Sequence, residues 1–525
     1  MATLVDTATA TAVTSASDVL ANHHPPTDPS ASTSSSTTTT DHTNGKPTKP
    51  SKMASKYRHV FATHSKQQIS PFTQGAQAPS FVGFRNLMIL VLIVSNLRLM
   101  IENFQKYGVV ICIHCHDYRR EDVIRGLLLY LSVPFHLFIA YLIELAAAQQ
   151  AKAAAARMKR AGEDHDTPEK QAAARRSFHS TWRIIAMAHG INASASLMIA
   201  STVVYFDIYH PGIGTLCELH AIVLWLKVCS YAFTNRDLRH AYLHPTSSAP
   251  LPDVYKECPY PRNINFKNLC YFWWAPTLIY QPVYPRTSHI RWGFVLQRIL
   301  EVLGLSIVIW IASAQYAAPL LQNSMDKVLQ LDVVSIAERV MKLSTISIFC
   351  WLCGFYALFQ SALNALAEVM TFGDRDFYAD WWNVSSIRNY WTSWNKPVTN
   401  FMRRHVYSPL VGRGWSPQAA QLAVFVLSGI LHELAVGIPT HNVIAFTGMM
   451  IQIPLILFTD KLQRWKAMNG QVAGNVIFWI SFCLVGQPLA ALLYFFAWQA
   501  KYGSVARNRE GWDRSPVGAI FGTRR

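Results

Sequence analysis

A single histidine inside an otherwise apolar stretch is the residue of this chain best suited to carry chemistry. His432 lies in the run from Ala419 to Val436, which is mostly hydrophobic. Such a run predicts a membrane helix, where a titratable ring is costly and usually functional. An imidazole can take up a proton near neutral pH. We therefore expect His432 to act as a base on a lipid-soluble substrate.

The start of this helix can be placed from its capping residues. Ser416 and Pro417 are favoured at the N-cap and first helical positions. At about 1.5 Å per residue, His432 lies roughly 22 Å along the axis, inside a hydrocarbon core about 30 Å thick. Ser428 precedes it by one turn on the same face, and Glu433 is turned about 100° away. The alternative is a structural histidine bonded to a neighbouring helix.

A second candidate block, Phe377–Asn383, reads Phe-Tyr-Ala-Asp-Trp-Trp-Asn and lies in a basic gap between apolar runs. Apolar and aromatic residues then recur every three or four positions, which predicts an interfacial amphipathic helix broken near Pro397. The stripe consists of Trp391, Trp394, Val398, Phe401, Met402 and His405. Membrane anchoring alone would explain it. The cations Lys396, Arg403 and Arg404 off the stripe also suit a donor that carries phosphates.

Two amides interrupt later apolar runs, namely Gln452 and Gln487. An amide in lipid needs hydrogen-bond partners, so these residues favour a polar chamber around His432. Ordinary bonding between helices, worth about 0.6 kcal/mol on average, is the alternative. The neighbouring prolines at 439, 454 and 488 would loosen the helices around such a chamber.

The composition predicts the elements that must position these residues. Of 525 residues, 51% are hydrophobic and 15% are charged, against about 25% charged in soluble domains. Apolar runs of about 20 residues predict about nine transmembrane helices. The runs are Phe81–Met100, Gly126–Ile143, Ile184–Phe206, Thr215–Phe233, Val302–Leu321, Leu343–Ala367, Pro417–Pro439, Asn442–Thr459 and Ala473–Trp498.

Charge and low-complexity segments set the expected organisation. The net charge of +17 lies mostly in gaps between apolar runs, which fits positive-inside loops and anionic lipid and disfavours nucleic acid. We expect a disordered cytosolic tail at residues 1–78, a membrane domain at 79–500 and a basic tail at 501–525, with the C-terminus in the lumen. The Cys112–His116 segment matches a haem-attachment pattern. It stands in a short loop, so we expect no metal site.

At these residues the chain resembles the membrane-bound O-acyltransferase family. The Phe377–Asn383 block matches the FYxDWWN sequence of its diacylglycerol and sterol acyltransferase branch. Four further segments resemble the type-1 diacylglycerol acyltransferases within that branch, and the similarity runs from about residue 81 to about residue 500. The segments are Asn96–Leu99, Phe272–Leu278, Ala445–Pro454 and Gly486–Pro488.

The resemblance implies an all-α bundle of about nine membrane helices around an intramembrane reaction chamber. It further implies a homodimer in the endoplasmic reticulum that transfers an acyl group from acyl-CoA to diacylglycerol, with no metal and no cofactor. His432 would be the base, and Asn383 would orient the thioester. Acyl-CoA contacts are expected from Asp380, Trp382, Asn383, Trp394, Asn395, Arg404 and His405, and acceptor contacts from Glu433, Met449, Gln452 and Gln487.

Two other functions remain open from the sequence. A sterol or wax-alcohol acyltransferase would use the same chemistry with another acceptor. A transporter or channel could use His432 and Glu433 as a proton or ion relay. Transporters often contain paired repeats, and none is evident in this chain.

Overall fold

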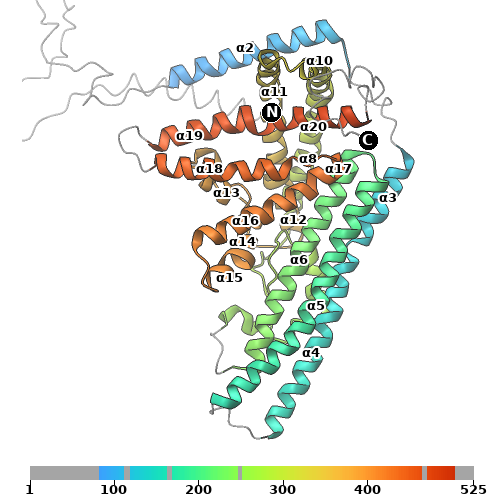
Figure 1. The fold of residues 1–525 in the computed structure, drawn as a ribbon, viewed down its shortest axis with the longest axis vertical. Coiled ribbons are helices and arrows are strands. Elements are labelled where there is room, and N and C mark those ends of the chain that lie inside the picture. The colour runs from blue at the N-terminus through green and yellow to red at the C-terminus, as the bar shows by residue number, and fades with distance from the viewer. Residues whose placement is uncertain (1–81, 111–118, 162–167, 246–250, 464–469, 503–525) are drawn as a thin grey trace, which may run out of the picture. The chain divides into compact units, whose positions relative to one another are not determined.

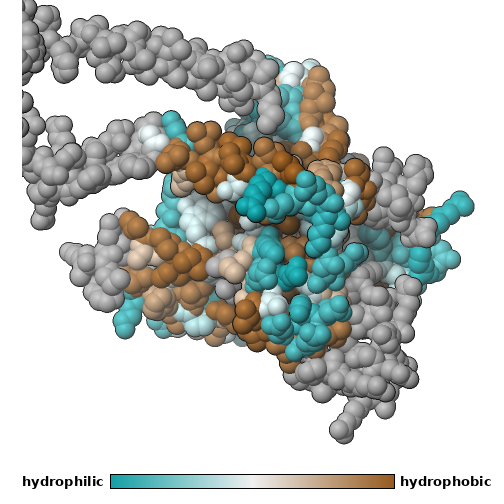
Figure 2. Space-filling view, turned by 90° about the horizontal axis from the view of Figure 1, so that it is seen from above, coloured by the Kyte–Doolittle hydropathy of each residue, from teal (hydrophilic) through white to brown (hydrophobic). Residues whose placement is uncertain are grey.

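Helices make up nearly all of the part of the chain that the computed structural model describes. The described residues are 82–110, 119–161, 168–245, 251–463 and 470–502. Within these ranges nine helical segments are long and apolar enough to cross a membrane. Hydrophobic side chains cover much of the visible surface (Figure 2). The prediction of an all-α polytopic membrane protein with about nine spans is confirmed. The predicted tail at 1–78, the motif at 112–116 and the residues from 503 onward lie outside the described part.

The first half of the described chain consists mainly of long helices (Figure 1). These are α2 (Val82–Tyr107), α3 (Arg120–Ser132), α4 (Phe135–Ala161), α5 (Pro168–Asp207) and α6 (Pro211–Leu243). After a loop region follow η1 (Asp253–Glu257), α7 (Phe266–Trp274), α8 (Trp292–Ala312), η2 (Ser313–Ala317), α9 (Ala318–Gln322), α10 (Met325–Leu329), α11 (Val333–Phe355), η3 (Tyr356–Ala362) and α12 (Leu363–Val369).

The second half carries the candidate site on shorter and more broken helices (Figure 1). They are η4 (Trp381–Asn383), α13 (Ile387–Ser393), α14 (Lys396–Met402), η5 (Arg403–Tyr407), α15 (Ser408–Val411), α16 (Pro417–His432), η6 (Glu433–Gly437), α17 (Ile438–Thr440), α18 (Ala445–Gln463), α19 (Gly470–Ile480), η8 (Ser481–Gly486) and α20 (Gln487–Tyr502). The predicted helix break near Pro397 is confirmed, because α13 ends before it and α14 contains it as its second residue.

Prolines divide two of the segments that the apolar pattern predicts as single spans. The segment Gly126–Ile143 is split between α3 and α4, since Pro134 has no N–H to continue the helical ladder. The segment Ala473–Trp498 is divided into α19, a π-helical turn η8 and α20, with Pro488 at the second position of α20. Hydropathy located both segments but could not show these breaks.

Helices α4, α5 and α6 lie side by side and share a buried ionic cluster (Figure 1). Glu144 on α4 is fully buried. Its Oε1 lies 3.1 Å from Nε2 of His189 on α5, and its Oε2 accepts a hydrogen bond from Nη1 of Arg239 on α6 at 3.1 Å. A buried charge is tolerated only when it is paired, so this cluster fixes the register of the three helices.

A second buried cation, Lys227 on α6, holds the C-terminal end of α7. Its Nζ donates to the carbonyls of Phe272, Trp273 and Ala275 at 2.8, 2.9 and 2.8 Å. All three ammonium protons are therefore satisfied, and the positive charge complements the negative end of the helix dipole. Lys227 lies within the predicted span Thr215–Phe233, and through it a loop is anchored to that span.

We predict that Glu144→Ala destabilises the fold by about 3–5 kcal/mol, because the change leaves Arg239 buried without its partner. The measurement is thermal unfolding in detergent. Glu121→Ala is the control, since Glu121 pairs with Arg119 and Arg125 at an exposed site, where a pair is worth about 0–1 kcal/mol. Equal melting temperatures for the two variants would show that the buried cluster does not stabilise the bundle.

Candidate active site

The helix that carries His432 begins and ends as its sequence predicts. The Ser416 hydroxyl caps it by accepting a hydrogen bond from the amide of Ala419 at 3.2 Å, and Pro417 is the first helical residue. His432 is the last residue of α16, and the π-helical turn η6 follows directly. Widened turns of this kind occur frequently at functional sites.

The hydrogen bonds of His432 determine which ring nitrogen is free. Nδ1 lies 2.7 Å from the carbonyl oxygen of Ser428, one turn earlier on the same helix. A carbonyl can only accept, so Nδ1 carries the proton and donates it to this bond. In the neutral ring, Nε2 then carries the lone pair. This is the protonation state that a general base requires.

Helix α13 packs across the face of α16 that carries Phe425 and His432. The ring of Trp391 lies 6.0 Å from that of Phe425 and 6.4 Å from that of His432, nearly perpendicular to both. One turn earlier, Arg388 donates to Gln421 on α16 at 2.5 Å and forms an ion pair of 2.6 Å with Asp460 on α18. These contacts bring the segment after the Phe377–Asn383 block directly against the histidine.

The block itself alternates between buried and exposed side chains. Phe377 and Trp381 are buried, and Trp381 is almost completely enclosed by other aromatic rings. Asp380, Trp382 and Asn383 are exposed. These three residues are among the seven predicted to contact acyl-CoA. They point outward from a turn that is anchored by the buried indole of Trp381.

Two residues of α19 hold this turn in place, and sequence reasoning missed both. Asn475 donates from Nδ2 to the backbone carbonyls of Trp382 and Val384 at 3.1 and 2.8 Å. At Gly474, a Cβ atom would collide with the backbone carbonyl of Ser385. The turn lies more than 80 residues earlier in the chain, so no local pattern could have signalled the contact.

The remaining residues predicted to contact the donor lie at the junction of α13 and α14 or in η5. Trp394 is half-buried and stacks on Tyr390 at a centroid distance of 6.0 Å. The Asn395 side chain caps α14 by accepting from the amide of Val398 at 3.2 Å. Arg404 is exposed. Arg404 therefore has a freely presented charge, whereas Trp394 and Asn395 have clear structural roles as well.

His405 is held mainly by protein contacts. Its Nε2 lies 2.8 Å from the Ser230 hydroxyl on α6, and its ring stacks with Phe233. Burial, with the charge of Arg404 as a smaller cause, lowers the pKa of His405 to about 4. The ring is thus neutral at physiological pH and serves to attach η5 to α6.

The predicted acceptor residues lie on η6, α18 and α20. Oε2 of Glu433 accepts from the amide of Phe446 at 2.8 Å and so caps the start of α18. Met449 is buried in the aromatic cluster, and Gln452 is half-buried on α18. Gln487 opens α20, and its side chain lies outside the described part of the structure.

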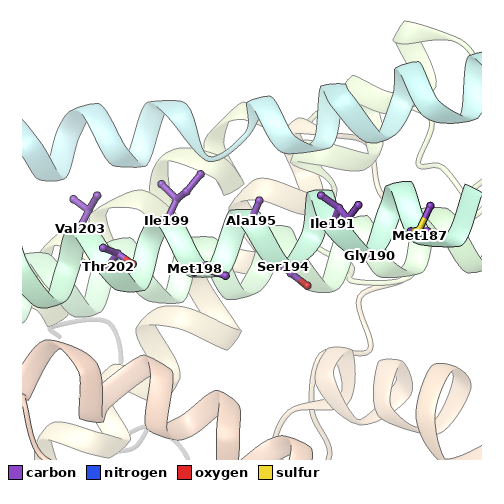
Figure 3. A pocket seen from close by; sticks show the side chains of 9 residues that line it. All are labelled: Met187, Gly190, Ile191, Ser194, Ala195, Met198, Ile199, Thr202 and Val203. Atoms are coloured by element: carbon purple, nitrogen blue, oxygen red, sulfur yellow. The ribbon is translucent and has the colours of Figure 1, made fainter.

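A groove of 790 Å³ runs along α5 rather than beside His432 (Figure 3). It is lined by Met187, Gly190, Ile191, Ser194, Ala195, Met198, Ile199, Thr202 and Val203. The lining is almost wholly apolar and lies on a membrane-spanning helix, as expected of a lipid-facing surface. The contacts around His432, and not this groove, define the candidate active site.

Comparison with known proteins identifies the family of the chain. The model of the membrane-bound O-acyltransferase family matches residues 179–496, which include His432 and Asn383. The chain is 36% identical to diacylglycerol O-acyltransferase 1A of Glycine max over 445 residues, which is 84% of this chain and 82% of that protein. It is 35% identical to diacylglycerol O-acyltransferase 1 of Dictyostelium discoideum over 83% of this chain and 66% of that protein. It is 31% identical to diacylglycerol O-acyltransferase 1 of Arabidopsis thaliana, over 86% of this chain and 80% of that protein.

We predict that Gly474→Ala displaces the turn that presents Trp382 and Asn383, because the added methyl group collides with the Ser385 carbonyl. Hydrogen exchange measured by mass spectrometry should show faster exchange for amides of residues 381–389. Gly304→Ala is the matched control, since nothing lies within 4 Å of its added Cβ. Unchanged exchange in the Gly474 variant would contradict the close packing of α19 on this turn.

Proposed function

The chain belongs to the membrane-bound O-acyltransferase family, and we propose that it transfers an acyl group from acyl-CoA to the free hydroxyl of a diacylglycerol. The products are triacylglycerol and CoA. The relatives named as diacylglycerol O-acyltransferases support this choice of acceptor over a sterol or a wax alcohol. The observation that carries the proposal is the lone pair that His432 keeps on Nε2, inside a membrane helix.

The reaction needs one base and no covalent enzyme intermediate. Nε2 of His432 takes the proton from the acceptor hydroxyl as its oxygen attacks the thioester carbonyl carbon. The carbon–sulfur bond then breaks, and the imidazolium returns the proton to the departing thiolate. A positioned base supplies about 10²–10⁴-fold acceleration, and alignment of the two substrates supplies much of the remainder.

The donor is proposed to enter along the surface formed by η4, α14 and η5. Asn383 would orient the thioester, since its amide is exposed on the turn next to the buried Trp381 anchor. Asp380, Trp382 and Arg404 are also exposed on this side. The Arg404 guanidinium suits the phosphates of CoA, because arginine forms charge-assisted hydrogen bonds with such groups. Trp394, Asn395 and His405 would support this surface through their protein contacts.

The acceptor is proposed to approach His432 from the side of α18 and α20. Glu433, Gln452 and Gln487 are the polar residues assigned to it, with Met449 as an apolar contact. Oε1 of Glu433 is buried without a hydrogen-bond partner among the described residues, which leaves it able to accept from a hydroxyl. The acyl-transfer step itself requires no metal and no cofactor, since acyl-CoA is a substrate.

The proposed setting is the endoplasmic reticulum membrane, with the N-terminus in the cytosol and the C-terminus in the lumen. We assign catalysis to residues 79–500, between a Ser/Thr-rich tail at 1–78 and a basic tail at 501–525. A homodimer is also proposed. It is supported by α2, whose apolar residues from Ile89 to Met100 are exposed, since an unpacked apolar stretch of a membrane helix is a candidate for contact with a second copy.

We predict that His432→Ala lowers acyl transfer at least about 100-fold, because the proton acceptor is lost. The assay supplies purified protein with labelled oleoyl-CoA and competing diacylglycerol, cholesterol and a long-chain alcohol, and identifies products by mass. His289→Ala, at an exposed loop histidine, is the control and should retain full turnover. Near-normal turnover by the His432 variant would end the base assignment, and preferential esterification of cholesterol or the long-chain alcohol by the wild type would overturn the acceptor.

We also predict that Asn383→Ala damages transfer from every acyl-CoA alike, because its role is to orient the thioester that all donors share. Rates measured with a series of acyl-chain lengths at saturating diacylglycerol test this. A defect confined to acceptor choice would place Asn383 on the other substrate.

A further inference from the structure

The turn that carries Asn383 and the helix that carries His432 have to lie at a fixed separation for the proposed reaction. The two residues are far apart in the chain and belong to different elements, η4 and α16. Transfer between two bound substrates is fast only when the reacting atoms are aligned, and a displacement of about 1 Å can cost about 10²-fold in rate. Contacts that join these two elements therefore bear directly on the chemical step.

A short buried connection joins the Asn383 turn to α13. Val384 and Ser386 are buried, and the Ser386 hydroxyl caps α13 by accepting from the amide of Asn389 at 3.3 Å. Ile387, the first residue of α13, is buried as well. The place of α13 among its neighbours therefore sets where the turn with Asn383 lies.

Arg388 joins α13 to both α16 and α18. Its Nη1 donates to Oε1 of Gln421 on α16 at 2.5 Å. Its Nε and Nη2 lie 2.7 and 2.6 Å from Oδ2 of Asp460 on α18. Beside it, the Ile387 amide donates to the Thr459 hydroxyl at 3.2 Å. One side chain thus ties the donor turn to the helix of the base and to a helix that carries predicted acceptor residues.

Neither partner of Arg388 is explained by the helix that contains it. Gln421 interrupts the apolar run of α16, where an amide needs a hydrogen-bond partner. Asp460 lies in the last turn of α18, where the helix dipole disfavours a negative charge. A cation placed between the two side chains offsets both costs. The three residues therefore form a specific contact between three helices.

The contact is only partly buried. The Arg388 side chain is 39% exposed and that of Asp460 is 20% exposed. Ion pairs near the surface contribute little to the stability of a fold. The contact is therefore better suited to placing α13 than to holding the bundle together, and its effects on activity and on unfolding can be separated.

We propose that Arg388 is a positioning residue that sets the separation between Asn383 and His432 through its bonds to Gln421 and Asp460. The inference rests on the proposed function, in which Asn383 orients the thioester and Nε2 of His432 takes the hydroxyl proton. Arg388 contacts neither substrate and exchanges no atom or electron. It keeps the substrates aligned while the carbon–oxygen bond forms and the carbon–sulfur bond breaks.

The test reverses the charges of the pair. Arg388→Glu brings two carboxylates together, and adding Asp460→Arg restores an ion pair in the opposite order. The Gln421 amide can bond to either arrangement, because it both accepts and donates hydrogen bonds. We expect kcat per folded protein to fall about 10- to 100-fold in the single variant and to return to within about 3-fold of wild type in the double variant. The KM values for acyl-CoA and diacylglycerol should change less than about 3-fold.

Arg388→Gln is a milder second variant, which decides the question if Arg388→Glu does not fold. It should lose about 10-fold in kcat while its melting temperature in detergent stays within about 3 °C of wild type. Wild-type kcat per folded protein in Arg388→Gln would overturn the proposal, whether or not the melting temperature falls. A folded double variant that keeps the low kcat of Arg388→Glu would overturn it as well.

Arg125→Glu provides the matched control. Arg125 on α3 forms a similarly exposed ion pair with Asp207, at the end of α5, at 3.2 Å. This variant should retain wild-type kcat, and a loss equal to that of Arg388→Glu would also overturn the proposal. Failure of the proposed function would be distinct, because the wild-type protein would then form no triacylglycerol.

Discussion

The hydrogen bond between Nδ1 of His432 and the Ser428 carbonyl is the interaction on which the active site depends. It places the proton on Nδ1 and leaves the lone pair on Nε2. The bond requires His432 to lie one turn after Ser428 on α16. Ser416, as the N-cap, and Pro417 determine where this helix begins. The π-helical turn at η6 then redirects the chain immediately after the histidine. Without this bond, the tautomer of the base would be undetermined.

Three helices, α13, α16 and α18, form the surroundings of the histidine. Helix α16 supplies the base and α13 the aromatic wall, and Arg388 on α13 ties the three helices together by bonding to Gln421 on α16 and Asp460 on α18. Helix α19 adds the clamp on the turn that carries Asn383. The predicted donor and acceptor residues lie on separate elements, the former between η4 and η5 and the latter on η6, α18 and α20. This arrangement suits an acyltransferase that receives one substrate from water and the other from the membrane.

Features that depend on local sequence could be predicted. The capping residues predicted the start of α16, and hydropathy predicted the nine spans. Pro397 predicted the break between α13 and α14. Contacts between distant segments could not be predicted, because neither periodicity nor composition records which residues pair in space. The Glu144 cluster spans 95 residues, and Asn475 contacts a carbonyl 93 residues away.

The most direct measurement of the central claim is acyl transfer by a protein in which His432 carries a methyl group on Nε2. The methyl group occupies Nε2 and leaves the neutral ring with its lone pair on Nδ1, against the Ser428 carbonyl, so that no proton can be taken up at Nε2. The account predicts that this protein folds, retains acyl-CoA binding and forms no triacylglycerol above the level of His432→Ala. Turnover comparable to that of the unmodified protein would contradict it, because Nε2 could then not be the base.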